Sequence, residues 1–287
     1  MSVLSFLKRK DLSFKLLLRK TKTLFYAITK PFSNKEPFCD KPLASESEYL
    51  NLWQEAKNIR YHEIDKLEIE LGYRIDLEWF SKLALITQVC IKESELCFAH
   101  GRVLYTVLKN YLNNSNLQSI NIIEVGTARG FSSLCMAKVL QENKVQGRII
   151  TIDPLPIRRK IFWNCILDHK GKKNRKELLI DYIDLVNNYI LFKKGKSEDI
   201  LTKKIFDRIH MAFIDGVHEY ENVSNDANYI QKYQMKGDII IFDDYSNNIF
   251  PGVVKAVDEF CLRYNYSLKV INANENRSYA IAQKYNT

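Results

Sequence analysis

The sequence predicts an α/β protein with a doubly wound, mostly parallel sheet of about seven strands and a helical N-terminal extension. From residue 120 onward, short apolar runs alternate with segments of helical periodicity, which is typical of parallel strands joined by crossover helices. The first apolar run ends in a glycine-containing turn at residues 126–130, just before a helical segment. Residues 45–112 show helical periodicity alone.

Helices are expected throughout the section that precedes the sheet. Ser45 stands as a cap before the first of them, and two more fit residues 77–91 and 95–112. The last of these contains His100 and Arg102. Their side chains either face a substrate or, in the more ordinary interpretation, are satisfied within the packing of the helices.

The sheet itself is expected to contain five parallel strands closed by a hairpin-like pair. The predicted strands are 120–125, 148–152, 190–193, 209–214, 239–242, 268–271 and 278–282. The predicted helices are 131–142, 221–234 and 253–264. Residues 154–189 form a long crossover, and its basic cluster is expected to be a solvated face: Lys170, Lys172, Lys173, Arg175 and Lys176.

Positive charge is concentrated at the N-terminus. Residues 1–30 hold eight Lys and Arg against one Asp, so they carry +7 of the net +9 and leave +2 for the rest. A nearly neutral body gives no case for a nucleic-acid partner. The basic segment also contains Leu, Phe and Ile, which predicts either an amphipathic arm that contacts a membrane surface or a partner, or a helix that caps the core.

The expected organisation has three regions. Residues 1–44 form a basic arm and linker, residues 45–116 a helical lid or interface, which would also serve a homo-oligomer, and residues 117–287 the α/β domain. Six cysteines without C-x-x-C pairs indicate reduced thiols and a cytoplasmic location, with membrane-surface association as an open alternative. No apolar run reaches the roughly 20 residues that span a bilayer, and Lys8, Arg9 and Lys10 interrupt any signal-peptide pattern.

Acidic side chains follow four of the predicted parallel strands. They are Glu124, just before the glycine turn, then Asp153, Asp215 and the pair Asp243 and Asp244. Ligands of open parallel sheets bind beyond the carboxyl ends of the strands. A single acid after a strand is routine helix capping, but several on one edge repel and raise one another's pKa. A divalent cation or a hydroxyl-rich ligand would relieve that repulsion.

Asp153 ends the second strand, where a carboxylate can accept both hydrogen bonds of a ribose diol. The competing interpretation is an N-cap before Pro154. The turn at residues 126–130 would face the rest of a nucleoside ligand, although a plain tight loop between strand and helix explains it equally well. Ser132, in the first turn of the following helix, is placed to bind a carboxylate tail.

Asp215, Asp243 and Asp244 end two successive strands and are therefore expected to be neighbours. Three carboxylates with open positions suit a hard cation, Mg²⁺ or Mn²⁺. His218 follows Asp215 by three residues, and a neutral imidazole there would take a proton from a substrate hydroxyl. A metal would lower the pKa of that hydroxyl. The alternative is that His218 is an ordinary histidine of a surface loop.

Taken together, five motifs resemble class I S-adenosylmethionine-dependent methyltransferases, a Rossmann-like fold. The resemblance is to the group related to macrocin O-methyltransferases and, more distantly, to catechol-type enzymes. It covers roughly residues 95–285 and lies in Glu-Val-Gly-Thr-x-x-Gly-Phe-Ser (124–132), Ile-Asp (152–153), Phe-Ile-Asp-Gly-Val-His (213–218), Gly-Asp-Ile-Ile-Ile-Phe-Asp-Asp-Tyr (237–245) and Pro-Gly-Val-x-x-Ala-Val-Asp-Glu-Phe (251–260).

The resemblance implies that residues 117–287 are an S-adenosylmethionine-binding catalytic domain. Asp153 would hold the ribose, and Gly195 and Ser197 would pass the adenine. The methionine end would be held by Glu124, Gly126, Thr127, Gly130, Phe131 and Ser132. Asp215, Asp243 and Asp244 stand where the family binds Mg²⁺. Catechol-type enzymes use Asn for the third ligand and Lys as the base, so Asp244 and His218 fit the macrocin-like branch, whose substrates are sugar hydroxyls.

The expected function is therefore Mg²⁺-assisted methyl transfer from S-adenosylmethionine to a hydroxyl of a sugar, glycoside or other small diol. Asp215 and His218 are the expected catalytic residues. Two alternatives stay open: a metal-dependent hydrolase or phosphoesterase that uses the same acids, and a non-catalytic binding module.

Overall fold

A computed structural model of the chain describes residues 41–92 and 94–285. The basic arm expected over residues 1–30, and the linker up to residue 40, lie outside the described residues. Within the described part, no helix combines the length and apolar character needed to cross a membrane. The five described cysteines are free thiols, and four of them are buried.

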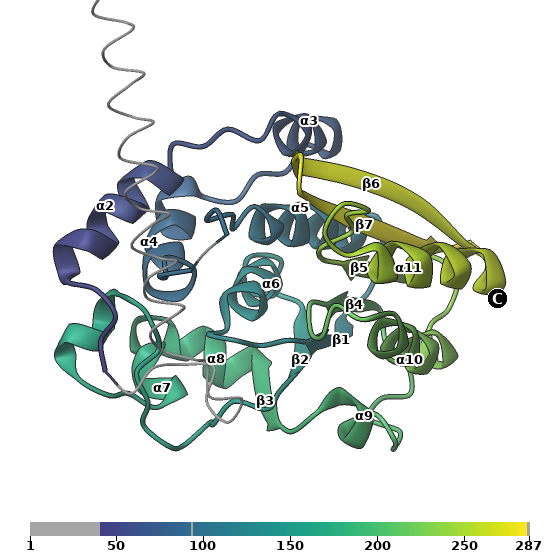
Figure 1. Ribbon diagram of the computed structural model, residues 1–287. Coiled ribbons are helices and arrows are strands. Elements are labelled where there is room, and N and C mark those ends of the chain that lie inside the picture. Colours follow the sequence, from purple (N-terminus) through teal and green to yellow (C-terminus); the bar gives the residue numbers. More distant parts are fainter. Residues whose placement is uncertain (1–40, 93, 286–287) are drawn as a thin grey trace, which may run out of the picture.

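A seven-stranded sheet in the order β3-β2-β1-β4-β5-β7-β6 forms the centre of the molecule (Figure 1). The strands are β1 Ser119–Val125, β2 Gln146–Asp153, β3 Ile190–Lys194, β4 Met211–Ile214, β5 Ile239–Phe242, β6 Tyr266–Asn274 and β7 Arg277–Lys284. The first five are parallel, and β7 runs antiparallel to both β5 and β6. The predicted doubly wound sheet with a closing hairpin is confirmed.

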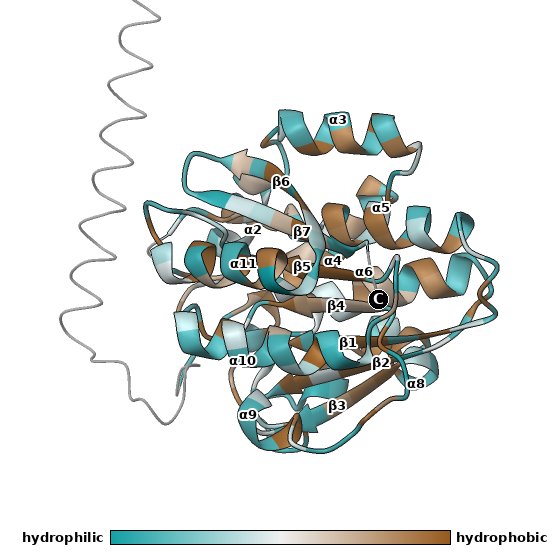
Figure 2. Ribbon diagram, turned by 90° about the vertical axis from the view of Figure 1, so that its right-hand side faces the viewer, coloured by the Kyte–Doolittle hydropathy of each residue, from teal (hydrophilic) through white to brown (hydrophobic). Residues whose placement is uncertain are grey.

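Both faces of the sheet are buried, which explains why its parallel strands are continuous apolar runs. Neighbouring residues of one strand enter different cores: Ile122 joins the first and Ile123 the second. Figure 2 shows the hydrophobic strands between two helical layers. The first core includes α4 (Leu77–Thr87), α5 (His100–Asn113), α6 (Phe131–Glu142) and α8 (Ile183–Tyr189), and the second includes α10 (Tyr220–Ile230) and α11 (Pro251–Tyr264). The short helix α7 (Arg175–Leu178) precedes α8 in the crossover, and the short helix α9 (Ser197–Ile200) follows β3.

The helices before the sheet differ from the prediction in three ways. The helix expected over residues 95–112 begins only at His100, and the one expected over 77–91 ends at Thr87. Helix α2 (Glu46–Ala56) starts as expected, with a capping box between Ser45 and Glu48. Helix α3 (His62–Leu71) lies within the section expected to be helical, but no separate helix was predicted there. These helices pack against the sheet in the first core, and the three-region division of the chain stays a prediction.

Helix α3 lies over β6 and is held there by polar side chains (Figure 1). Glu63 accepts hydrogen bonds from the backbone N–H of Asn272 at 2.7 Å and from its side chain at 2.8 Å. On the other side of α3, the buried Arg102 of α5 donates to Glu68 at 2.7 Å and 2.6 Å. The packing interpretation of Arg102 is therefore confirmed.

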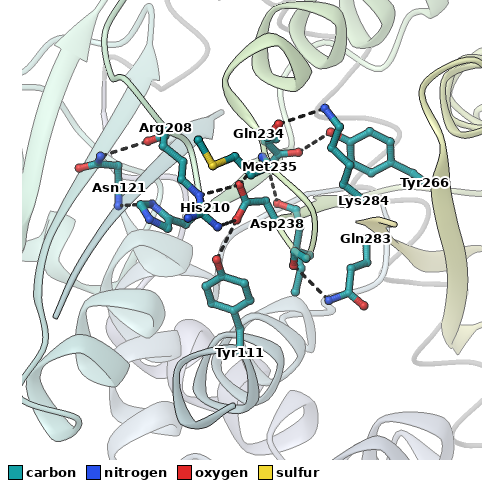
Figure 3. A network of polar contacts seen from close by, with 12 residues as sticks. Tyr111, Asn121, Arg208, His210, Gln234, Met235, Asp238, Tyr266, Gln283 and Lys284 are labelled. Carbon is teal, nitrogen blue, oxygen red and sulfur yellow. Dashed lines mark hydrogen bonds and ion pairs between the residues drawn. The ribbon is translucent and has the colours of Figure 1, made fainter. Parts of the chain in front are cut away.

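A polar network anchors the amino ends of the central strands, opposite the acidic edge (Figure 3). Asp238, fully buried just before β5, accepts hydrogen bonds from Arg208 at 2.8 Å and 3.0 Å and from the Tyr111 hydroxyl at 2.8 Å. The backbone N–H of Met235 adds a further bond at 2.7 Å. A buried carboxylate with a guanidinium and this many donors is well compensated. The network therefore holds the amino end of β5 in place and leaves its carboxyl end available for other groups.

The glycine at the end of β1 is required by the fold itself. Gly126 has φ +98°, and a Cβ on it would lie 1.9 Å from the carbonyl oxygen of Asp215. The N–H of Asp215 in turn donates to the carbonyl of Val125 at 2.8 Å. The turn after β1 and the end of β4 thus touch backbone to backbone.

We expect Gly126→Ala to lower the free energy of unfolding by roughly 2–4 kcal/mol, because it combines a left-handed backbone with a backbone clash. Urea unfolding would measure this. Gly72→Ala is the matched control, since Gly72 has φ +78° but a Cβ on it would meet no atom within 4 Å, so it carries the backbone strain alone. Equal losses for the two variants would contradict the close-contact argument.

Candidate functional site

The predicted acids gather at the carboxyl edge of the sheet, beyond β1, β2, β4 and β5. The turn at residues 126–130 is tethered to the end of β2. The N–H of Ala128, at φ +44°, donates to Asp153 Oδ2 at 2.7 Å, and the hydroxyls of Thr127 and Thr151 lie 2.5 Å apart. Gly130, at φ +92°, closes the turn by donating to the carbonyl of Thr127 at 2.7 Å.

Glu124 is fully buried beneath the turn. Its carboxylate accepts hydrogen bonds from the hydroxyls of Ser132 and Ser133 in the first turn of α6. Burial raises the pKa of Glu124, and the two hydroxyls oppose that rise. Ser132 is therefore engaged with Glu124, and Ser133 is a partner that the motif did not single out. Contact of Glu124 and Ser132 with a ligand stays a prediction.

Phe131, expected beside a cofactor, has its side chain in the core. It is 1% exposed and packs against the rings of Phe80 and His100, with ring centres 5.3 Å and 5.0 Å away. Only its backbone, at the start of α6, is left for a ligand. The same core explains His100, whose burial lowers the pKa of the imidazole to about 4. His100 is therefore packed in the core, but within the described residues its Nδ1 has no hydrogen-bond partner, so the expectation of a satisfied histidine is met only in its packing.

Asp153 ends β2 as predicted, and no helix begins after it, so the N-cap interpretation is wrong. Its Oδ1 accepts the N–H of Leu155 at 2.7 Å, while Oδ2 accepts that of Ala128. Each carboxylate oxygen has two acceptor positions. The backbone of Thr127 adds a further hydrogen bond to this carboxylate, so the tip of the turn and the end of β2 are joined by several contacts.

Arg175 stands behind Asp153 and corrects the expectation of a solvated basic face. It is 1% exposed, with Nη2 3.9 Å from Asp153 Oδ1, and its guanidinium lies 5.4 Å and 5.1 Å from the ring centres of Trp163 and Phe192. Among the residues that the structure describes, none offers a hydrogen-bond partner to its guanidinium nitrogens. Burial raises the pKa of Asp153, and the charge of Arg175 is the main effect that opposes this. A charge count along the sequence does not distinguish Arg175 from its exposed neighbours.

Gly195 and Ser197 lie beyond β3, next to the end of β2. The N–H of Gly195 donates to the backbone carbonyl of Asp153 at 3.0 Å. The Ser197 side chain hydrogen-bonds Asp226 of α10, a buried carboxyl that is 4% exposed. Burial raises the pKa of Asp226 to about 6. The structure thus brings both residues to the β2 side of the edge, and their contact with adenine stays a prediction.

Asp215, His218 and Asp244 form the acidic cluster of the site. His218 Nε2 lies 3.3 Å from Asp215 Oδ1 and 3.3 Å from Asp244 Oδ2. One potential ligand atom from each residue falls within 4.8 Å of the others, so the described residues fit a divalent cation. Burial, followed by the charge of Asp243, raises the pKa of Asp215 to about 7, while His218 and Arg277 oppose the rise.

Asp243 departs from the predicted metal-ligand set because Arg277, at the start of β7, occupies its carboxylate. Arg277 donates to the two oxygens of Asp243, from Nη2 at 2.5 Å and from Nε at 3.2 Å. Oδ1 also accepts the N–H of Asp244 at 2.7 Å. The group that fits a cation therefore consists of Asp215, His218 and Asp244, whereas the predicted set was Asp215, Asp243 and Asp244. Arg277 is the first residue of a strand that carries no motif, so the sequence carried no signal for it.

The segment that holds most of this site is similar to known proteins. Residues 123–245 match a family model described as a methyltransferase domain. An uncharacterized protein of Acanthamoeba polyphaga mimivirus is 29% identical over 185 residues, which cover 61% of this chain and 76% of that protein.

Solved structures share the fold at low sequence identity. The O-methyltransferase NovP has a TM-score of 0.53 at 15% identity, covering 84% of this chain and 100% of NovP. An O-methyltransferase from Bacillus cereus in complex with SAH has a TM-score of 0.50 at 14% identity, covering 83% of this chain and 100% of that one. At these identities the two structures establish the fold.

The buried Asp226 predicts a pH-dependent stability change. Its pKa is raised on folding, so the folded state loses stability as the pH rises from about 4 to about 6, where the carboxyl must ionise in a buried place. We expect Asp226→Asn to gain up to about 3 kcal/mol above pH 7, at about 1.4 kcal/mol per pKa unit, and nothing below pH 4.

Urea unfolding at several pH values would measure this difference. Asp207→Asn is the control, because the exposed Asp207 has a pKa lowered by Lys204 and should show no gain at neutral pH. A gain for Asp226→Asn that is the same at pH 4 and pH 7.5 would refute the argument.

Proposed function

Because residues 123–245 form a methyltransferase domain on the class I S-adenosylmethionine-dependent fold, we propose that the chain transfers a methyl group from S-adenosylmethionine to a hydroxyl, with help from a divalent cation. The acceptor is a sugar, glycoside or other small molecule that carries neighbouring hydroxyls. One observation carries the proposal: the turn after β1 and the acidic cluster after β4 are joined by the Gly126–Asp215 backbone contact.

The donor half of the proposed site consists of the turn and the end of β2. Asp153 would accept the ribose diol, because it ends β2 at the edge of the sheet where the turn after β1 meets it. Arg175 supports this role, because its charge offsets the burial that otherwise favours the neutral acid. The backbone N–H groups at the start of α6 would meet the methionine carboxylate. Gly195 and Ser197 would border the adenine.

The acceptor half consists of the acidic cluster. Asp215 and Asp244 would hold Mg²⁺ or Mn²⁺, which when bound acidifies and orients a hydroxyl. Chelation of two adjacent oxygens favours a diol, which agrees with the resemblance to macrocin-type enzymes. Methyl transfer needs no covalent bond between the protein and the methyl group. Alignment of the methyl carbon and the hydroxyl for in-line displacement supplies most of the acceleration.

We assign His218 to the hydroxyl proton and leave the cation to the two carboxylates, although its Nε2 lies within reach of both Asp215 and Asp244. Burial acts to lower the pKa of His218, but its hydrogen bond to Asp215 and the charges of Asp215 and Asp244 outweigh burial and raise it. A raised pKa makes the imidazole a better proton acceptor, provided that it is neutral when the acceptor binds. Phe250, whose ring centre lies 4.7 Å from that of His218, restricts the imidazole on one side.

Two other functions use the same acids, and a binding measurement separates them. A metal-dependent hydrolase or phosphoesterase should not bind S-adenosylhomocysteine (SAH), whereas a methyltransferase should. A non-catalytic binding module would bind SAH but would not produce SAH from S-adenosylmethionine. Titration calorimetry with SAH, followed by a screen of sugar acceptors for SAH release with Mg²⁺ and with EDTA, distinguishes all three.

We expect His218→Ala to lower kcat by about 10²–10⁴-fold, the usual contribution of a general base. SAH affinity should change little, because His218 lies in the acceptor half. Asp215→Ala should likewise lose turnover, and EDTA should reduce the activity of the unmodified protein. Rates of SAH release on the acceptor identified in the screen provide the measurement.

His169→Ala is the control for the loss of an imidazole, since His169 lies outside the site and pairs with Glu46 of α2 at 3.6 Å. Full turnover in both His218→Ala and Asp215→Ala would refute the proposed mechanism. Loss of SAH affinity in His218→Ala would instead move that residue to the donor half.

A further inference from the structure

Arg277 places a positively charged guanidinium beside Asp243 and Asp244, at the acidic cluster. It begins β7, the strand that pairs with β5, and so its side chain meets the acids that follow β5. Two of its nitrogens engage the two oxygens of Asp243, and Nε also lies 3.5 Å from Asp244 Oδ1. A bidentate guanidinium–carboxylate pair is among the strongest polar contacts that proteins form.

Asp243 is not free to leave this pair. Its side chain is 0% exposed, and that of Arg277 is 19% exposed. Rotation of the carboxylate toward Asp215 would leave a largely buried guanidinium without its partner, which is strongly unfavourable. By contrast, the side chains of Asp215 and Asp244 are 24% and 11% exposed, and both contact His218. Asp244 also lies 3.5 Å from Nε of Arg277.

The formal charges agree with this division. Asp243 and Arg277 sum to zero. Asp215 and Asp244 then carry −2, which one divalent cation balances. If all three carboxylates bound the cation, the cluster would keep −1 at the ligands while Arg277 stood unpaired beside it. Hard divalent cations often use only one or two protein carboxylates and fill the other positions with water or substrate oxygens.

We propose that Arg277 withholds Asp243 from the cation, so that Asp215 and Asp244 are its carboxylate ligands and Arg277 is a positioning residue that limits cation affinity. The inference rests on the proposed cation-assisted function and adds to it a ligand set and a residue that controls that set. The consequence is a cation that keeps positions open for the two oxygens of a diol.

Manganese binding tests the proposal without any turnover. The free Mn²⁺ signal in electron paramagnetic resonance gives the dissociation constant for the full chain without donor or acceptor. Asp244→Asn should weaken Mn²⁺ binding by about 10–100-fold, as the loss of metal-site groups does. Asp243→Asn alone should also weaken Mn²⁺ binding, because it leaves the charge of Arg277 uncompensated beside the cation, so Asp243 is tested as a ligand in the absence of Arg277.

Arg277→Met should tighten Mn²⁺ binding by about tenfold or more, since it releases Asp243 as a third carboxylate. Arg277→Lys keeps the charge and should bind Mn²⁺ less tightly than Arg277→Met. The double variant Arg277→Met/Asp243→Asn should return to the affinity of the unmodified protein, because the released ligand is gone. Thermal unfolding and SAH titration establish that each variant is folded.

A loss of Mn²⁺ affinity in the double variant as large as that of Asp244→Asn would overturn the proposal, as would unchanged or weaker binding in Arg277→Met. If Asp243→Asn does not fold, Arg277→Met and the double variant decide the question. Absence of Mn²⁺ binding by the unmodified protein at millimolar concentration also overturns it. Failure of the methyltransferase function would appear separately, as absence of SAH binding in a protein whose Mn²⁺ series behaves as expected.

Discussion

The site depends on the contact between the backbone of Gly126 and that of Asp215. No side chain fits at residue 126, where a Cβ would stand 1.9 Å from a carbonyl oxygen. The parallel pairing of β1 and β4 ends at this point. The turn at residues 126–130 and the loop that carries Asp215 and His218 both leave the sheet here. In the sequence, Gly126 suggests a place where a ligand approaches the backbone. In the structure, it first allows the two halves of the site to lie together.

Much of the fold was readable because its signals are local. Buried parallel strands are apolar runs, and β5 and α6 were predicted with their observed bounds. Because the carboxyl ends of parallel strands share an edge, the positions of Glu124, Asp153 and Asp215 followed from topology alone. Helix α3 escaped because its place is set by contacts with β6 and α5, which lie far away in the sequence.

Partners of the acids could not be predicted in the same way. Arg175 and Arg277 are ordinary basic residues in their local sequence, yet each lies beside a carboxylate that the motifs single out. Their identity as counter-ions depends on how the crossover and the last strand return to the sheet. The motif therefore located the acids, while the tertiary structure decided which of them carry compensated charge and which do not.

The contact between α3 and β6 also bears on how the molecule avoids aggregation. An edge strand presents unpaired N–H and C=O groups on which another chain can add a strand. At β6, Glu63 takes one of these N–H groups, that of Asn272, and α3 covers the strand. At the opposite edge, β3 ends in Lys193 and Lys194, whose charges disfavour stacking of like strands. The sheet thus protects its two edges by different means, one by a side-chain cap and the other by repulsion.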